Sequence, residues 1–487
     1  MNPLPPLDKL DPAEAWKPWR PTAADPWGRK WAAHLYRRAG FGASREELVE
    51  AEARGPDATI ELLLRGEPGA ADLVPTLTDA GRVAAGKNDG GVLLRDWWLY
   101  CMLQGGHPLR EKLTLFWHNH FATSIAKVRD PRLMFRQNCL LREHALGKFG
   151  PFLQAMSRDV AMLVWLDSNS NVKGKPNENY AREVMELFSL GVGNYTEKDV
   201  REAARAFTGW HTDGTAFLFK TELHDDGEKT VLGKTGKWDG GDVVEIILTR
   251  PAAAKFLVRK LYTAFVSEVA PPDALLEPLC ESFRAGGYDV AALMQVVLSS
   301  RLFFSDHAFR KRIKSPVEYV LGAVRAVYRR YPERDREYRP LEPSRLQRWL
   351  TGMGQILFAP PNVKGWPGGR TWLNTSTVLE RDNFAAAIAT DNLLWWDATQ
   401  VGFAPAEGTP PPKACDAARV LDEEKAATPD AAARALLDLH VPGGVRPEAR
   451  ERLVAFLAEG NPTGPAFAHR AREAAHAVLT MPEYQLA

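Results

Sequence analysis

Histidine and carboxylate side chains occur in this sequence at spacings that a folded chain could gather into one site. His118 and His120 stand two residues apart in the run WHNHF. In a regular helix such residues point about 200° apart, so both reach one metal ion only if the helix ends there. Glu183 and Glu186 are three residues apart and therefore share one edge of a helix.

These residue types support metal-dependent or acid–base catalysis. Neutral imidazole and carboxylate oxygen are ligands for Zn, Fe or Mn, and a suitably placed glutamate can transfer protons. We therefore predict a divalent metal, Zn, Fe or Mn, in a cleft between two helical halves. The predicted metal ligands are His118, His120, His224 and Asp225, and the predicted catalytic carboxylates are Glu178, Glu183 and Glu186.

Each of these residues also has an ordinary structural interpretation. His120 would be a core histidine with a satisfied hydrogen bond, and His224 would lie on a turn. The glutamates would form ion pairs with Arg182 or Arg201. Both interpretations stay open at the level of the sequence.

A second group of candidates surrounds the Gly- and Pro-rich stretch 360–372. Exposed tryptophan rings there could stack on sugars or on peptide prolines, whereas buried rings would be core residues, which we favour. The residues predicted to take part in binding are Asn177, Arg182, Lys364, Trp366 and Trp372. They define the alternative function, a non-catalytic protein that binds a glycan or a protein partner.

Helix start and stop signals predict the elements that carry these residues. Ser44 with Glu47 three residues later is typical of a capping box, and Pro108 is suited to the first turn of a helix. Only the stretch near residues 215–235 alternates apolar and polar residues between turn signals. The predicted fold is mainly α, a bundle-like assembly of many helices with a small β-hairpin insertion there.

Composition divides the chain into four segments. We predict an extended N-terminal segment (1–25), a main helical domain (26–400), a linker and variable segment (401–445), and C-terminal helices that pack on the main domain (446–487). The strongest linker signal is the proline-rich run 405–413.

Charge and hydropathy exclude several classes of protein. Lys and Arg number 62 and Asp and Glu 61, which leaves a net charge of +1, so nucleic acid is not an expected partner. The basic cluster 310–314 is predicted to be a solvated helix boundary. No apolar run is long enough to span a membrane. The N-terminus lacks the apolar core of a signal peptide, so a cytoplasmic location is expected, with export by another route left open.

Several ordered motifs together resemble a known family. The matching stretches are Arg38–Gly42, Phe116–Phe121, Arg142–Gly147, Asn177–Glu183, Phe188–Trp210, His224–Asp225, Lys314–Glu318, 360–372 and Met481–Leu486. In these stretches the chain resembles the bacterial domain-of-unknown-function family 1800. The resemblance implies no particular reaction. It implies a sulfatase-like partner from the uncharacterised family 1501, whose genes often neighbour those of this family.

We therefore expect a metal-dependent enzyme, a hydrolase or an oxidoreductase, whose substrate the sequence does not specify.

Overall fold

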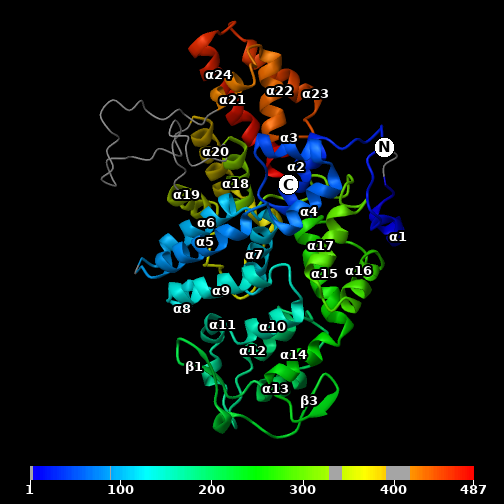
Figure 1. Ribbon diagram of the computed structural model, residues 1–487, viewed down its shortest axis with the longest axis vertical. Helices are drawn as coiled ribbons and strands as arrows, with labels where there is room; N and C mark the ends of the chain where they lie inside the picture. Colours follow the sequence, from blue (N-terminus) through cyan, green and yellow to red (C-terminus); the bar gives the residue numbers. More distant parts are fainter. Residues whose placement is uncertain (1–3, 88, 328–342, 391–416) are drawn as a thin grey trace.

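The structure, a computed structural model, describes residues 4–87, 89–327, 343–390 and 417–487 (Figure 1). In these ranges the chain is mainly helical, and strands occur only within residues 210–236. The predicted fold class is therefore confirmed. The predicted capping box is also present, because Ser44 Oγ accepts a hydrogen bond from the Glu47 amide and the Glu47 carboxylate accepts one from the Ser44 amide.

The helices follow one another in three groups along the chain. The first group is α1 (Pro12–Ala15), α2 (Arg29–Ala39), α3 (Arg45–Arg54), α4 (Pro56–Arg65), α5 (Ala70–Ala85), α6 (Val92–Gln104) and α7 (Pro108–His120). The second group is α8 (Ile125–Val128), α9 (Pro131–His144), α10 (Phe149–Ser157), α11 (Val160–Trp165), α12 (Asn179–Glu186), α13 (Glu197–Ala206), α14 (Gly240–Leu248), α15 (Pro251–Phe265), α16 (Asp273–Ala285) and α17 (Val290–Ser299). The third group is α18 (Pro316–Val327), α19 (Pro343–Gly352), α20 (Thr375–Ala389), α21 (Ala417–Glu423), α22 (Pro429–His440), α23 (Pro447–Ala458), α24 (Gly464–Thr480) and α25 (Pro482–Gln485). Short 3-10 helices occupy Leu7–Lys9, Ser168–Ser170, Thr221–Leu223 and Gly369–Trp372.

Two buried apolar clusters hold the helices together, and α7 belongs to both. Leu113 and Trp117 lie in the first cluster, with residues of α2, α10 and α12–α17. Leu115 lies in the second cluster, with residues of α6, α9, α18 and α20. Side chains two residues apart on α7 therefore enter different surroundings, as expected for residues on opposite faces of a helix.

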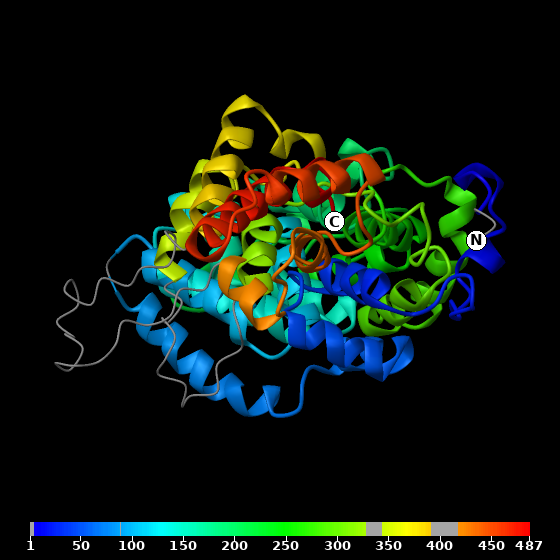
Figure 2. The same cartoon turned by 90° about the horizontal axis from the view of Figure 1, so that it is seen from above.

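The C-terminal helices return to the layer formed by α18 and α20. Figure 2 shows α24 running beside α20, and α24 also contacts α22. The predicted linker differs from the structure, because α21 and α22 occupy part of 401–445 and bury apolar residues. The proline-rich run 405–413 itself lies outside the described residues.

The N-terminal segment also differs from the extended form predicted for residues 1–25. It contains α1, and both Trp16 and Trp19 are buried. The Trp16 indole donates a hydrogen bond of 2.7 Å to the Leu275 carbonyl. Burial of these two large aromatic rings helps to hold this proline-containing segment on the domain.

Two hairpins replace the single predicted one. Strands β1 (Trp210–Thr212) and β2 (Phe217–Phe219) pair antiparallel, as do β3 (Lys229–Val231) and β4 (Lys234–Gly236). The turn of the second hairpin has positive φ at both Leu232 and Gly233, the backbone form typical of a two-residue hairpin. Asp225 separates the hairpins, where it forms an ion pair with Arg205 of α13.

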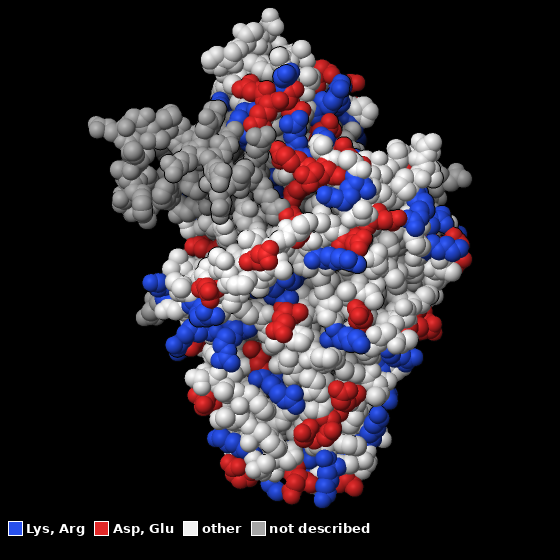
Figure 3. Space-filling view, viewed as in Figure 1, with Lys and Arg blue, Asp and Glu red and all other residues white. Residues whose placement is uncertain are grey.

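The surface carries both signs of charge. In the face drawn in Figure 3, basic and acidic side chains are interspersed over the described residues, and neither sign gathers into a large area. Along the ranges that the structure describes, no helix has the length and apolarity that crossing a bilayer requires.

Candidate functional site

The two histidines of the WHNHF run point into different clusters. The His118 ring contacts Trp98, Phe358 and Trp366, with ring centroids 5.3 to 5.6 Å apart. His120 Nε2 lies 3.0 Å from the Phe188 carbonyl oxygen in the other cluster. Since α7 stays helical through His120, the two imidazoles cannot share one ion.

His224 and Asp225 are also held by other partners. His224 Nδ1 lies 2.9 Å from the Thr208 carbonyl oxygen. Asp225 accepts hydrogen bonds from the Arg205 guanidinium, which lowers the pKa of the carboxyl to about 2. Nowhere in the described ranges do three or more His, Cys, Asp or Glu side chains form a group that could hold a metal ion. The predicted ligand set of His118, His120, His224 and Asp225 is therefore not assembled.

Two of the three predicted catalytic glutamates have structural partners. Arg182 Nη2 binds Glu178 at 3.0 Å and Glu197 at 2.7 Å, so Arg182 holds carboxylates and is not free for a ligand. Glu186 accepts a hydrogen bond of 2.6 Å from the Tyr195 hydroxyl. Asn177, predicted to bind a ligand, instead accepts a hydrogen bond from the Asn179 amide at the start of α12.

Glu183 differs from these glutamates. Its half-buried carboxylate has no hydrogen-bond or ion-pair partner among the described residues. Burial raises the pKa of this carboxyl, and the nearby Glu186 raises it further, while Arg182 and Lys364 oppose the shift. A carboxyl with a raised pKa and free oxygens is suited to accept a proton from a bound molecule.

The loop 360–372 brings Lys364 to this neighbourhood. The Asn119 side chain binds the loop backbone, because its Oδ1 accepts a 2.6 Å hydrogen bond from the Trp366 amide. Gly365 has φ of +79°, and a Cβ there would lie 2.1 Å from Asn119 Oδ1, so only glycine permits this approach. Trp366 is 5% exposed and Trp372 7%, so both predicted binding residues are core residues without an open ring face.

Lys260 of α15 is a polar residue that the sequence analysis missed. Burial lowers the pKa of its ammonium to about 8, and no carboxylate partner for it lies in the described ranges. It lies 5.2 Å from the centre of the Phe256 ring, and its charge contributes to lowering the pKa of His120. Its only sequence signal is a lysine four residues after Phe256, on a helix whose other face is apolar.

We name as the Glu183 site the neighbourhood formed by the end of α7, α12, α15 and the loop 360–372. Phe188 links two of its parts, since its carbonyl oxygen contacts His120 and its amide donates a 3.0 Å hydrogen bond to the Glu183 carbonyl. The members that carry polar groups are Asn119, His120, Glu183, Glu186, Lys260 and Lys364.

The fold and this site define a mainly α protein with a half-buried, unpaired glutamate near Lys364. The chain belongs to the family described as "Protein of unknown function (DUF1800)", which matches residues 34–486. No curated protein and no solved structure matches the chain.

Proposed function

We propose that the protein is a hydrolase in which Glu183 acts as the general base. The observation that carries this proposal is the unpaired, half-buried Glu183 carboxylate with its raised pKa. In its deprotonated form Glu183 would take a proton from a water molecule that attacks the substrate.

The charges around Glu183 suggest how a substrate would be oriented. Lys364 lies close enough for its charge to act on the Glu183 carboxyl. Lys260 has a pKa of about 8 and so keeps much of its positive charge near neutral pH. The Lys364 ammonium could attract an anionic group of the substrate or stabilise negative charge that develops during hydrolysis, whereas Lys260 acts on His120 and not directly on Glu183.

That the protein binds a divalent metal is a separate hypothesis from the role of Glu183. The predicted ligands do not form a group of three or more within the described residues, so no step of this proposal is assigned to an ion. Metal analysis of the purified full-length protein tests the metal hypothesis directly. Zn, Fe or Mn in a one-to-one ratio that survives dialysis would support it, and no retained metal would count against it.

Replacement of Glu183 tests the proposed reaction. The purified protein is offered chromogenic carboxylic, phosphate and sulfate esters, and hydrolysis is followed by absorbance. Glu183→Gln keeps the shape of the side chain but cannot accept a proton, so kcat should fall at least about 100-fold. In the unmodified protein, activity should decline as the pH falls through the raised pKa of Glu183.

Glu197→Gln is the matched control. Glu197 begins the neighbouring helix α13, is exposed and binds Arg182 of α12, so its replacement should leave kcat within about twofold. Equal thermal melts of the two variants would show that both are folded. Full activity of Glu183→Gln, or no hydrolysis of any ester class by the unmodified protein, would refute the proposal.

A further inference from the structure

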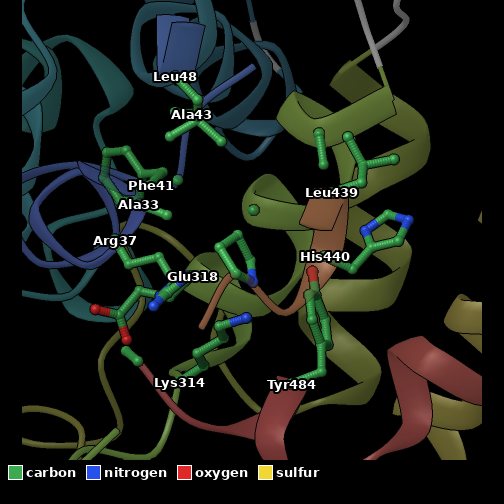
Figure 4. Close-up of a pocket in the computed structure, with 15 residues that line it drawn as sticks. Ala33, Arg37, Phe41, Ala43, Leu48, Lys314, Glu318, Leu439, His440 and Tyr484 are labelled. Atoms are coloured by element: carbon green, nitrogen blue, oxygen red, sulfur yellow. The ribbon is translucent and has the colours of Figure 1, made fainter. Parts of the chain in front are cut away.

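A group of basic side chains is buried where the N-terminal and C-terminal helices meet. Arg37 of α2, Lys314 just before α18, His440 of α22 and Tyr484 of α25 line one cavity of about 30 Å³ (Figure 4). This region lies outside the Glu183 site. Its basic residues include Lys314 from the cluster 310–314, predicted to be solvated, whereas Lys314 is only 3% exposed.

Glu318 supplies the one side-chain carboxylate among the residues that line this cavity, and both of its oxygens are already bound. Glu318 Oε1 binds Lys112 and lies 3.1 Å from Arg312 Nη1. Its Oε2 accepts a 2.7 Å hydrogen bond from the Ser315 amide. Glu318 therefore pairs with Lys112 and Arg312 and makes no direct ion pair with Lys314 or Arg37.

Lys314 has no such partner. Its Nζ lies 3.4 Å from the centre of the Tyr484 ring, and no acceptor binds the ammonium within the described ranges. Arg37 Nε and Nη2 are buried without a hydrogen-bond partner, and so is His440 Nδ1. Buried donors in native proteins are nearly always satisfied, so these groups point to a missing acceptor.

We propose that this cavity binds a small oxyanion of the phosphate or sulfate class, held by Lys314 and Arg37. A guanidinium and an ammonium form their strongest hydrogen bonds with anionic oxygen. Burial lowers the pKa of both groups, and a bound anion would favour their charged forms. The volume is about twice what one water molecule needs, so only a small group fits.

A second, larger cavity adjoins the inner one, so the oxyanion could be either a free ion or part of a larger molecule. This second cavity has a volume of about 200 Å³ and shares Leu48 and Leu439 with the inner cavity. Its charged lining is mixed, with Arg29, Arg45 and Arg434 beside Glu424 and Asp438. The inner cavity could therefore hold a free inorganic anion or the terminal phosphate of a larger molecule that extends outward. Both sources present the same chemical group to Lys314.

Calorimetric titration of the full-length protein with inorganic phosphate, sulfate and glycerol phosphate tests the proposal. We expect one equivalent of phosphate to bind and to raise the melting temperature. Lys314→Met should weaken binding at least about 10-fold, because a charge-assisted hydrogen bond is lost. Tighter binding of glycerol phosphate than of phosphate would indicate a larger ligand, and the reverse a free anion.

The matched control is Lys311→Met, the same replacement three residues earlier on an exposed side chain. Its phosphate affinity should be unchanged. If Lys314→Met does not fold, Arg37→Gln takes its place and should also weaken binding at least about 10-fold. No binding of phosphate or sulfate to the unmodified protein, or equal loss in the Lys311→Met control, would overturn the proposal.

Discussion

Glu318→Gln is expected to lower the free energy of unfolding by about 3–5 kcal/mol, the cost of removing one partner from a buried ion pair. The Glu318 side chain is 5% exposed, and its carboxylate balances the positive charges of Lys112 and Arg312. The neutral amide leaves both cations buried without a counter-charge. Chemical denaturation with urea at neutral pH measures the difference.

The ion pairs of Glu318 with Lys112 and Arg312 should also make the free energy of unfolding depend on pH. Burial alone would raise the pKa of Glu318, but Arg312 and Lys112 outweigh it and hold the pKa well below its ordinary value of 4.5. A carboxyl with a depressed pKa in the folded state contributes its stability above the unfolded-state pKa and loses it as the pH falls toward the folded-state value. The difference between the unmodified protein and Glu318→Gln should therefore shrink below about pH 4.5.

Glu50→Gln serves as the control for this experiment. Glu50 forms an exposed pair with Arg54 at 3.5 Å, so its replacement should change stability by no more than about 0.5 kcal/mol. Equal stability of Glu318→Gln and Glu50→Gln would show that the buried cations do not depend on Glu318.

Trp366→Ala is expected to lower the free energy of unfolding by about 3–5 kcal/mol, as truncation of a buried aromatic side chain does. The Trp366 ring is buried in the second apolar cluster and contacts the His118 ring. Its removal leaves a cavity beside α7 that the loop 360–372 cannot fill without breaking its hydrogen bonds to Asn119. A thermal melt, supported by urea denaturation, measures the loss.

Two further variants serve as controls for Trp366→Ala. Trp366→Phe keeps an aromatic ring in the cluster and should lose less stability than Trp366→Ala. Tyr100→Ala removes a ring that is 47% exposed and should have a small effect. If Trp366→Ala melted like the unmodified protein, the ring would be dispensable for packing, and the predicted binding role of the loop would regain support.

Local signals in the sequence determined much of the secondary structure. The capping box at Ser44 and the proline at the start of α7 act within one helical turn, so their effect does not depend on distant residues. Alternation over 215–235 indicated the region of β2, β3 and β4 for the same reason, but it missed β1 at Trp210–Thr212 and did not separate the two hairpins. The spacing of Glu183 and Glu186 identified both carboxylates as candidates but did not distinguish one from the other.

Only the tertiary structure decided which of these side chains have partners. His118 and His120 are only two residues apart in the sequence, yet they point into the two different apolar clusters on either side of α7. Tyr195 satisfies Glu186, whereas no described residue satisfies Glu183. Lys314 belongs to a charged run that is typical of a surface, and it became buried because the C-terminal helices close over it and bring Tyr484 against its ammonium. Burial and pairing depend on contacts between residues far apart in the chain, and no local pattern records them.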